Sequence, residues 1–402
     1  KKGGEYRGDY AQDHAPIREH TEIVGHAVRA MYLYIGATDF AQDDPKLLSA
    51  LERIWQNLTQ KRMYVTGGIG PSASNEGFTS DYDLPNFTAY AETCAACGLV
   101  FWGQRLLETT GNSEYADIVE RALYNGVLSG ISLSGDRFFY TNPLESRGNH
   151  ERVPWFDCAC CPPNIARLLG SLGWYVASVS QASTPNDPMP NAFWIHIPAG
   201  FEATATIKGV KVRIECESDY PWSGNFKVKV NPETPVEFEL RLRIPEWADD
   251  VDTDLPGLDK QSEWQQGYAV FAKRWEKGDT LTVDLGIQPK WNECNPKVRD
   301  NLGRVALSRG PLVYCAEEHD LGFAPQLFVA ATETPVVERE EALLGGVTTL
   351  TVEGFADSED FIDGLYSSEG TLAIAESGAK FVPYFAWCNR GANHMQVWVR
   401  RA

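Results

Sequence analysis

The sequence predicts a multidomain protein of the α + β class, in which a helical part comes first and antiparallel β-sandwich domains follow. Up to about residue 176, apolar residues recur at steps of three and four, which is typical of amphipathic helices. Pro and Asn then accumulate over residues 180–192, in SQASTPNDPMPNA. Beyond that stretch, apolar and polar residues alternate in short runs, which is typical of antiparallel sheets.

Helices are predicted at five places in the first part. They cover residues 21–35, 47–58, 94–110, 115–123 and 165–176. Long loops rich in Gly, Ser, Asn and Asp separate them, above all TGGIGPSASNEGFTSDYDLPN, which begins at Thr66. Loops of this length in a compact domain usually carry function, so we expect functional side chains there.

The second part consists of predicted strands. FEATATI, VKVRIEC, VEFELRLRI and MQVWVRR are examples, each bounded by turn residues. A weaker division falls near residue 290. We therefore place the domain boundaries at 1–182, 183–290 and 291–402, the first domain helical and the other two β-sandwiches.

Composition restricts the class of partner. The chain has 402 residues, of which 43% are hydrophobic, and its formal net charge is −19. This charge disfavours nucleic acids and anionic lipid surfaces, which attract basic patches, so a neutral ligand fits better. No apolar run is long enough to span a bilayer, and we expect a cytoplasmic protein. Because the chain starts KKGGEYRGDY without an initiator Met, we also expect that an N-terminal part is missing, which leaves a signal peptide open.

The cysteines are unevenly distributed. Of nine, five lie in the first half, and Cys158, Cys160 and Cys161 fall within four residues. An odd, clustered set in a large acidic chain indicates reduced thiols that bind metal or catalyse, with inert buried thiols as the alternative. Pro162 and Pro163 follow the cluster and favour the first turn of a helix, whose dipole lowers the pKa of nearby thiols.

Four-coordinate zinc needs ligands from a second segment, and AETCAACG offers Glu92, Cys94 and Cys97. On a regular helix Glu92 and Cys94 would point about 200° apart, so joint ligation requires a turn or a helix start there. By spacing alone, Cys94 and Cys97 serve nearly as well alongside Cys160 and Cys161. That thiolate-only set would be a closed structural zinc site.

At these residues the sequence resembles a known family. The runs YVTGGIG, SNEGF, AETC, FFYTNPLE, CACCPPNIARLLGSLGWY and SRGPLVYCAEE are similar to those of glycoside hydrolase family 127, the β-L-arabinofuranosidase family. The resemblance implies that residues 1–182 form part of an (α/α)6 catalytic barrel, followed by β-sandwich domains. A complete barrel has twelve helices, so the resemblance also implies that the N-terminal half of the barrel is absent.

The resemblance implies roles for individual residues. Zn²⁺ is the implied cofactor, with the ligands Glu92, Cys94, Cys160 and Cys161. Cys160 is the implied nucleophile of a retaining glycosidase and Glu76 the general acid/base, while His26 and Tyr140 contact the sugar. The implied partner is an arabinose-containing oligosaccharide or glycoconjugate.

Each of these residues also has a simpler interpretation. His26 taken alone is more often a structural histidine, Tyr140 a core residue and Glu76 a solvated loop carboxylate. Trp102, Trp155 and Trp174 could stack on a sugar, although packing is the commoner use of such residues. Cys97 and Cys158 have no implied role.

Several functions are compatible with these residues. The leading hypothesis is a zinc-dependent retaining glycosidase that releases terminal β-L-arabinofuranose. The alternatives are the same chemistry on another plant cell-wall sugar, and a non-catalytic, zinc-stabilised carbohydrate-binding or scaffold protein. A cysteine protease is disfavoured because no histidine lies near the cluster in sequence. We further predict that the β domains supply few or no groups to the reaction centre and form a homodimer interface.

Overall fold

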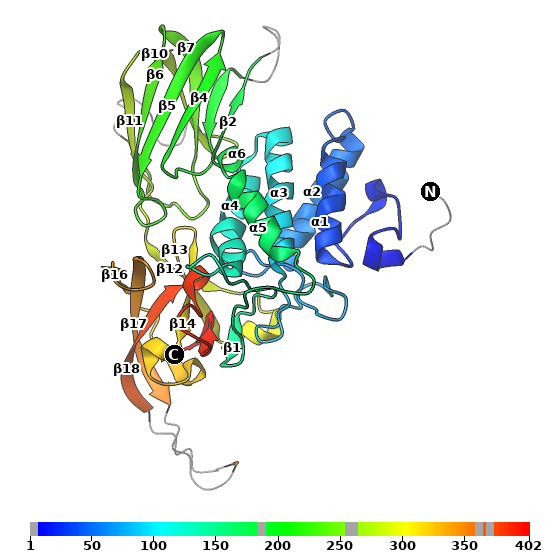
Figure 1. The fold of residues 1–402 in the computed structure, drawn as a ribbon, viewed down its shortest axis with the longest axis vertical. Helices are drawn as coiled ribbons and strands as arrows, with labels where there is room; N and C mark the ends of the chain where they lie inside the picture. Colours follow the sequence, from blue (N-terminus) through cyan, green and yellow to red (C-terminus); the bar gives the residue numbers. More distant parts are fainter. Residues whose placement is uncertain (1–6, 183–189, 254–263, 358–364, 367–373) are drawn as a thin grey trace. The chain divides into compact units, whose positions relative to one another are not determined.

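The structure is a computed structural model that describes residues 7–182, 190–253, 264–357, 365–366 and 374–402. The chain divides into two compact units (Figure 1). The first combines Lys1–Trp102, Arg121–Ala166 and Pro289–Ala402, and the second combines Gly103–Glu120 and Arg167–Gln288. No helix among the described residues is long and apolar enough to cross a membrane. Part of the predicted boundary segment, residues 183–189, lies outside the described residues.

All five predicted helices are present. They are α1 (Ala27–Thr38), α2 (Pro45–Lys61), α3 (Thr93–Thr110), α4 (Ser113–Arg121), α5 (Cys161–Gly170) and α6 (Gly173–Val176), the last two dividing the fifth prediction between them. The first helix starts later than predicted because the His26 side chain caps it, accepting a hydrogen bond from the Arg29 N–H. Asp44 caps α2 in the same way, with Pro45 in its first turn.

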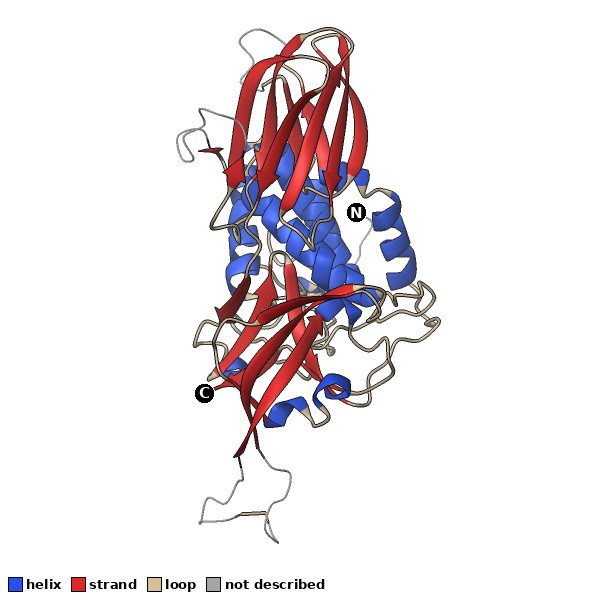
Figure 2. Cartoon of the chain, turned by 90° about the vertical axis from the view of Figure 1, so that its left-hand side faces the viewer, coloured by secondary structure: helices blue, strands red, loops and turns tan. Residues whose placement is uncertain are grey.

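The middle part of the chain forms two five-stranded sheets, as a β-sandwich requires (Figure 2). One sheet has the order β2 (Ala177–Ser180), β3 (Ala192–Ile195), β7 (Val236–Arg243), β10 (Tyr268–Trp275) and β9 (Trp264–Gln265). The other has the order β4 (Phe201–Ile207), β5 (Val210–Ser218), β6 (Asn225–Pro232), β11 (Asp279–Asp284) and β8 (Asp252–Thr253). Strand β2 pairs with β3, so the Pro/Asn-rich stretch connects two paired strands of one sheet.

The C-terminal part differs from the predicted sandwich, because its nine described strands, together with β1 from the helical segment, form one ten-stranded sheet that closes on itself. Strand β13 pairs with both β20 and β14, which closes a barrel of β13, β14, β18, β17, β15 and β20. Inward and outward residues alternate along the strands of barrels and sandwiches alike, so the sequence pattern could not separate the two. The elements after residue 288 are β12 (Pro289–Glu293), β13 (Arg304–Arg309), β14 (Leu312–Glu317), α7 (Glu318–Leu321), β15 (Phe328–Ala330), β16 (Val336–Glu340), β17 (Val347–Asp357), β18 (Ile374–Pro383), β19 (His394–Gln396) and β20 (Trp398–Arg401).

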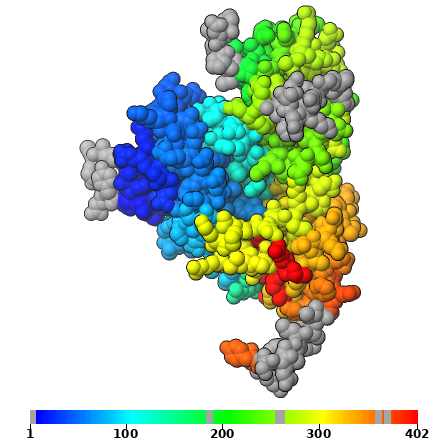
Figure 3. All heavy atoms as spheres, turned by 180° about the vertical axis from the view of Figure 1, so that it is seen from behind, coloured from blue at the N-terminus to red at the C-terminus, as the bar shows by residue number. Residues whose placement is uncertain are grey.

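The helical segment and the C-terminal barrel share one core. Strand β1 (Glu145–Arg147) comes from the helical segment but pairs with β19 at the edge of the C-terminal sheet. The Phe139 ring stacks on the Trp387 ring with centroids 5.1 Å apart. The Asn86 amide donates to Asn301 Oδ1 over 2.8 Å. Figure 3 shows yellow atoms of the C-terminal part against blue atoms of the helical segment. These parts therefore fold as one unit.

Candidate active site

A sharp turn before α3 brings Glu92 and Cys94 to one place. Ala91 has a positive φ of 37°, and α3 starts at Thr93, directly after Glu92. The Asn142 amide holds this turn by donating to the Ala91 carbonyl and to Thr93 Oγ1, each over 2.9 Å. The helix start that joint ligation by Glu92 and Cys94 requires is therefore present.

The other two thiols lie where α5 begins. Cys160 precedes the helix and Cys161 is its first residue, so the predicted position at a helix N-terminus is confirmed. Pro162 and Pro163 carry no N–H, so the first turn offers few backbone donors to a thiolate. The Asn164 N–H donates to the Cys160 carbonyl over 3.2 Å and fixes the loop end against the helix.

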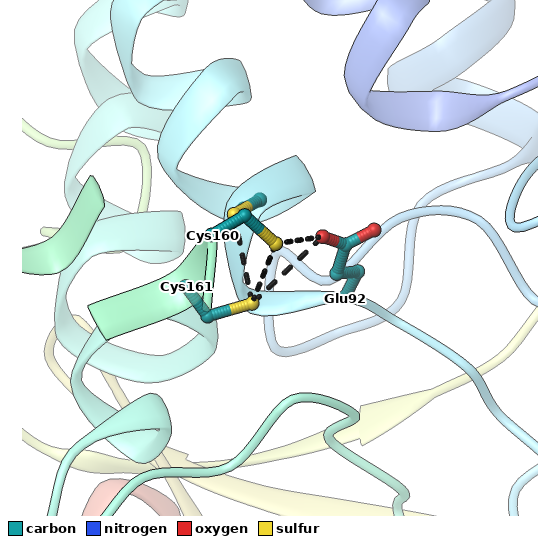
Figure 4. Close-up of side chains that lie close together, drawn as sticks. Glu92, Cys160 and Cys161 are labelled. Atoms are coloured by element: carbon teal, nitrogen blue, oxygen red, sulfur yellow. Dashed lines mark hydrogen bonds between the residues drawn. The ribbon is translucent and has the colours of Figure 1, made fainter. Parts of the chain in front are cut away.

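Four side chains converge in a compact cluster (Figure 4). Cys160 Sγ lies 3.3 Å from Glu92 Oε1 and 3.8 Å from Cys161 Sγ. Cys94 Sγ lies 3.5 Å from Cys161 Sγ. A tetrahedral zinc with bonds of about 2.3 Å to sulfur and 2.1 Å to oxygen separates its ligand atoms by roughly 3.6 to 3.8 Å. The spacing of the four donor atoms therefore fits one such ion.

The electrostatics of the cluster also fit a cation. Hydrogen bonds from Cys161 and Cys94 hold the pKa of Cys160 well below its usual range, while the same contacts raise the pKa of both donors. Burial raises the pKa of Glu92 to about 8, and Glu92 Oε2 is buried without a hydrogen-bond partner among the described residues. Three thiols and a carboxyl group with one unpartnered oxygen are thus a donor set that could hold a metal ion.

Glu76 and His26 lie next to this cluster. His26 Nε2 is 3.1 Å from Glu76 Oε2, and donor atoms of His26, Glu76 and Glu92 lie within 4.8 Å of one another. Because the Arg29 N–H donates to His26 Nδ1 over 3.4 Å, the neutral ring carries its proton on Nε2, toward Glu76. A carboxyl group hydrogen-bonded to a histidine therefore lies beside Glu92 of the cluster.

Close backbone packing between Gly25 and Gly77 fixes the position of Glu76. Its φ is +49°, in the left-handed region. The next residue, Gly77, packs so closely on Gly25 that a Cβ there would lie 1.9 Å from the Gly25 carbonyl oxygen. Ala27 N–H donates to the Glu76 carbonyl over 3.0 Å, and Phe78 N–H donates to the Gly25 carbonyl over 2.8 Å. The SNEGF loop is thus tied to the start of α1.

Tyr140 closes another side of the site. Its hydroxyl lies 3.5 Å from Cys160 Sγ, and its ring lies 6.0 Å from that of Tyr90. Burial raises the pKa of Tyr140, so its hydroxyl remains a hydrogen-bond donor. Tyr90 was not among the residues predicted for the site.

The remaining candidates lie elsewhere. Cys97 is buried in α3 and is not among the four clustered donors, while Cys158 is exposed. Trp102 is fully buried in the core, whereas Trp155 and Trp174 are exposed. Asn142 and Asn164 were not among the predicted site residues either, although Asn142 lies within FFYTNPLE and Asn164 within CACCPPN. The sequence feature that could have indicated these residues was an Asn close to a candidate site residue.

Three sequence profiles match the chain, and all describe parts of one family. They are the "Beta-L-arabinofuranosidase, GH127 catalytic domain" over residues 3–173, the "GH127 middle domain" over 195–287, and the "Glycoside hydrolase family 127 C-terminal domain" over 289–400. The chain belongs to glycoside hydrolase family 127. The resemblance seen in the sequence is confirmed, and the multidomain α + β architecture is that of family 127 structures.

Individual family 127 relatives extend the comparison. A non-reducing end β-L-arabinofuranosidase of Bifidobacterium longum subsp. longum is 34% identical over 424 residues, covering 99% of this chain. The crystal structure of a GH127 β-L-arabinofuranosidase from Geobacillus stearothermophilus T6 is 39% identical over 98% of this chain, with a TM-score of 0.92. A further structure, of a GH127 β-arabinofuranosidase, is 36% identical over 99% of this chain, with a TM-score of 0.90. The chain spans 62% of the first relative and 63% of each structure.

Proposed function

We propose that the complete protein is a retaining glycosidase that releases terminal β-L-arabinofuranose, with Cys160 as nucleophile and Glu76 as general acid/base. The observation that carries this proposal is the Glu92, Cys94, Cys160 and Cys161 cluster with the Glu76 carboxyl group beside it. The names of the relatives support the substrate, since two are described as β-L-arabinofuranosidases. The helices before β2 would then be part of an (α/α)6 barrel.

Exposure favours Cys160 over the other clustered thiols as nucleophile. Cys94 and Cys161 are only 1% and 0% exposed, whereas Cys160 is partly exposed. The Tyr140 hydroxyl lies 3.5 Å from Cys160 Sγ and marks its accessible side as polar. A sugar could therefore reach Cys160 while the two other thiolates remain ligands.

Glu92, Cys94, Cys160 and Cys161 would hold zinc. When bound by these four residues, the ion would keep the thiols deprotonated near neutral pH and would draw charge from the sulfur of Cys160. A carboxylate among the ligands, in place of Cys97, separates this set from a closed thiolate-only structural site.

Cys160 and Glu76 divide the reaction into two steps. First, Cys160 Sγ attacks the anomeric carbon while the carboxylic acid of Glu76 protonates the departing glycosidic oxygen, so a C–S bond forms and a C–O bond breaks. Next, the Glu76 carboxylate takes a proton from a water molecule, whose oxygen attacks the anomeric carbon and displaces the thiolate. Two inversions leave the anomeric configuration unchanged. His26 and Tyr140 would orient the sugar.

Replacement of the nucleophile tests this function in the complete protein. Cys160→Ser should lower the turnover of an aryl β-L-arabinofuranoside by several orders of magnitude, because a hydroxyl is a far weaker nucleophile than a thiolate near neutral pH. NMR of the first sugar released by the wild type should show a retained anomer. Cys97→Ser is the matched control and should keep most of the activity.

Four other outcomes would contradict the proposal. Near-normal turnover by Cys160→Ser would show that the nucleophile lies elsewhere, and an inverted first product would show direct displacement by water without a covalent intermediate on Cys160. Metal binding without turnover of any furanoside would favour a scaffold or carbohydrate-binding role. Turnover confined to another sugar would contradict the proposed substrate but not the proposed reaction mechanism.

A further inference from the structure

Asn164 contacts both cysteine segments of the cluster. Its side-chain amide donates a hydrogen bond to Cys94 Sγ over 3.1 Å. Its backbone N–H donates to the Cys160 carbonyl over 3.2 Å. Among the contacts described for the four clustered donors, this amide is the one side-chain N–H that points at a sulfur. The two proline residues before it have no N–H to offer, so Asn164 supplies the donor that the helix start lacks.

A tyrosine on a third helix fixes the direction of this amide. The Tyr32 hydroxyl on α1 donates to Asn164 Oδ1 over 3.1 Å. Because the amide oxygen is engaged by a hydroxyl, the NH2 group must face the other way, toward Cys94. Side chains from α1, α5 and α3 are thereby joined in one chain of hydrogen bonds.

We infer that Asn164, held by Tyr32, is a positioning residue that keeps Cys94 a permanent zinc ligand while Cys160 remains the reacting thiolate. This inference rests on the proposed function. An N–H···S hydrogen bond fixes the sulfur in place and draws electron density from it, which makes that thiolate a poorer nucleophile. In the part of the chain that the structure describes, the contacts of Cys160 Sγ include no side-chain amide; the partly exposed Cys160 lies 3.5 Å from the Tyr140 hydroxyl instead.

Zinc affinity measures this role independently of turnover. In the full-length protein, Asn164→Leu removes the donor at nearly constant volume and should weaken zinc binding about 10- to 100-fold in competition with a chromophoric chelator. In the Co²⁺-substituted protein, loss of the hydrogen bond should move the thiolate-to-metal charge-transfer band to lower energy. Leu169→Ala, a substitution of an exposed residue on the same helix, should change neither quantity.

Tyr32 provides a second, independent variant. Tyr32→Phe should weaken zinc binding by a smaller factor, because the amide keeps its donor but loses its anchor. In the Asn164→Leu background, Tyr32→Phe should cause no further loss, since Tyr32 acts through the amide. If Asn164→Leu fails to fold, Asn164→Asp preserves the shape and replaces the donor with an oxygen, with the same expected direction.

The outcomes separate the inference from the proposed function. A wild-type protein that binds no zinc would overturn the proposed function itself. A wild type that binds zinc, together with Asn164 variants of unchanged zinc affinity and unchanged Co²⁺ spectrum, would overturn only the role of Asn164. Additive losses in the double variant would contradict the connection through Tyr32.

Discussion

The Glu76 carboxyl group has neighbours suited to proton exchange. It is hydrogen-bonded to His26 Nε2, its side chain is 45% exposed, and it lies beside the Glu92 carboxylate of the cluster. In the proposed mechanism, a half-exposed position would let water reach this group in the second step, while the hydrogen bond to His26 would fix its orientation. Neither neighbour is near Glu76 in sequence, so these properties come from the fold.

Replacement of Glu76 should therefore affect substrates unequally. Glu76→Gln keeps the shape but removes the acid, so we expect a loss of about 10²- to 10⁴-fold on glycosides with poor leaving groups. Activated aryl glycosides, whose departure needs little protonation, should lose much less in the first step. A series of aryl arabinofuranosides with graded leaving groups measures the difference. Equal losses across the series would assign the general acid to another residue.

The site residues could be predicted to different degrees. The density of thiols and the Glu-x-Cys spacing indicated a metal site, but the choice between Glu92 and Cys97 required the turn at Ala91, which spacing does not reveal. The hydrogen bond between Tyr32 and Asn164 could not be predicted, because it joins side chains from separate helices. Such hydrogen bonds depend on packing angles rather than on local sequence.

At the scale of elements, the SNEGF loop depends on close backbone packing with the start of α1. A Cβ on Gly77 would lie 1.9 Å from the Gly25 carbonyl oxygen and 2.8 Å from the His26 Cα. Neither obstacle is a flexible side chain, so the loop itself would have to move. Since Glu76 is the adjacent residue, any such movement displaces the carboxyl group from the thiols.

Gly77→Ala should therefore reduce both stability and activity. We expect a loss of about 1 to 3 kcal/mol in the free energy of unfolding, measured with urea, and a larger relative loss in turnover than in zinc content. Gly36→Ala is the matched control, because a Cβ there meets nothing within 4 Å and Gly36 lies inside α1. That substitution should stabilise the protein by about 0.5 to 1 kcal/mol. A neutral Gly77→Ala would show that the loop does not need this close approach.

Sequence patterns suffice to predict the positions of the helices but not how the C-terminal strands pair. Apolar spacing predicted where the helices form, and these predictions are confirmed; the structure adds caps such as Asp44 with Pro45. The closure of the C-terminal sheet depends on the pairing of β13 with both β14 and β20, which brings together strands far apart in the chain. Alternation along each strand carries no information about that pairing.

At the scale of the whole molecule, the C-terminal barrel belongs to the same compact unit as the thiol cluster. The hydrogen bonds described for the clustered side chains go to residues before the middle domain. The barrel instead supports the segment that carries Tyr140. Trp387 stacks on Phe139, and Arg152, buried in the helical segment, donates to the Trp387 carbonyl over 2.7 Å.

This support predicts that damage to the barrel removes the site without touching a reacting group. Trp387 is fully buried, so Trp387→Ala should cost about 3 to 5 kcal/mol in the free energy of unfolding, because it leaves a large cavity. A chain ended at residue 288 should lose the edge partner of β1 and with it stoichiometric zinc binding.

Urea unfolding and zinc content, measured on the same samples, check both expectations. Val336→Ala is a suitable control because Val336 is 57% exposed on β16 and should change neither quantity appreciably. Loss of zinc from the shortened chain is expected because the helical segment and the C-terminal part share one core. An independently folded C-terminal domain could be removed without loss of metal. Normal zinc binding by the shortened chain would therefore show that the helical segment holds the four ligands in place by itself.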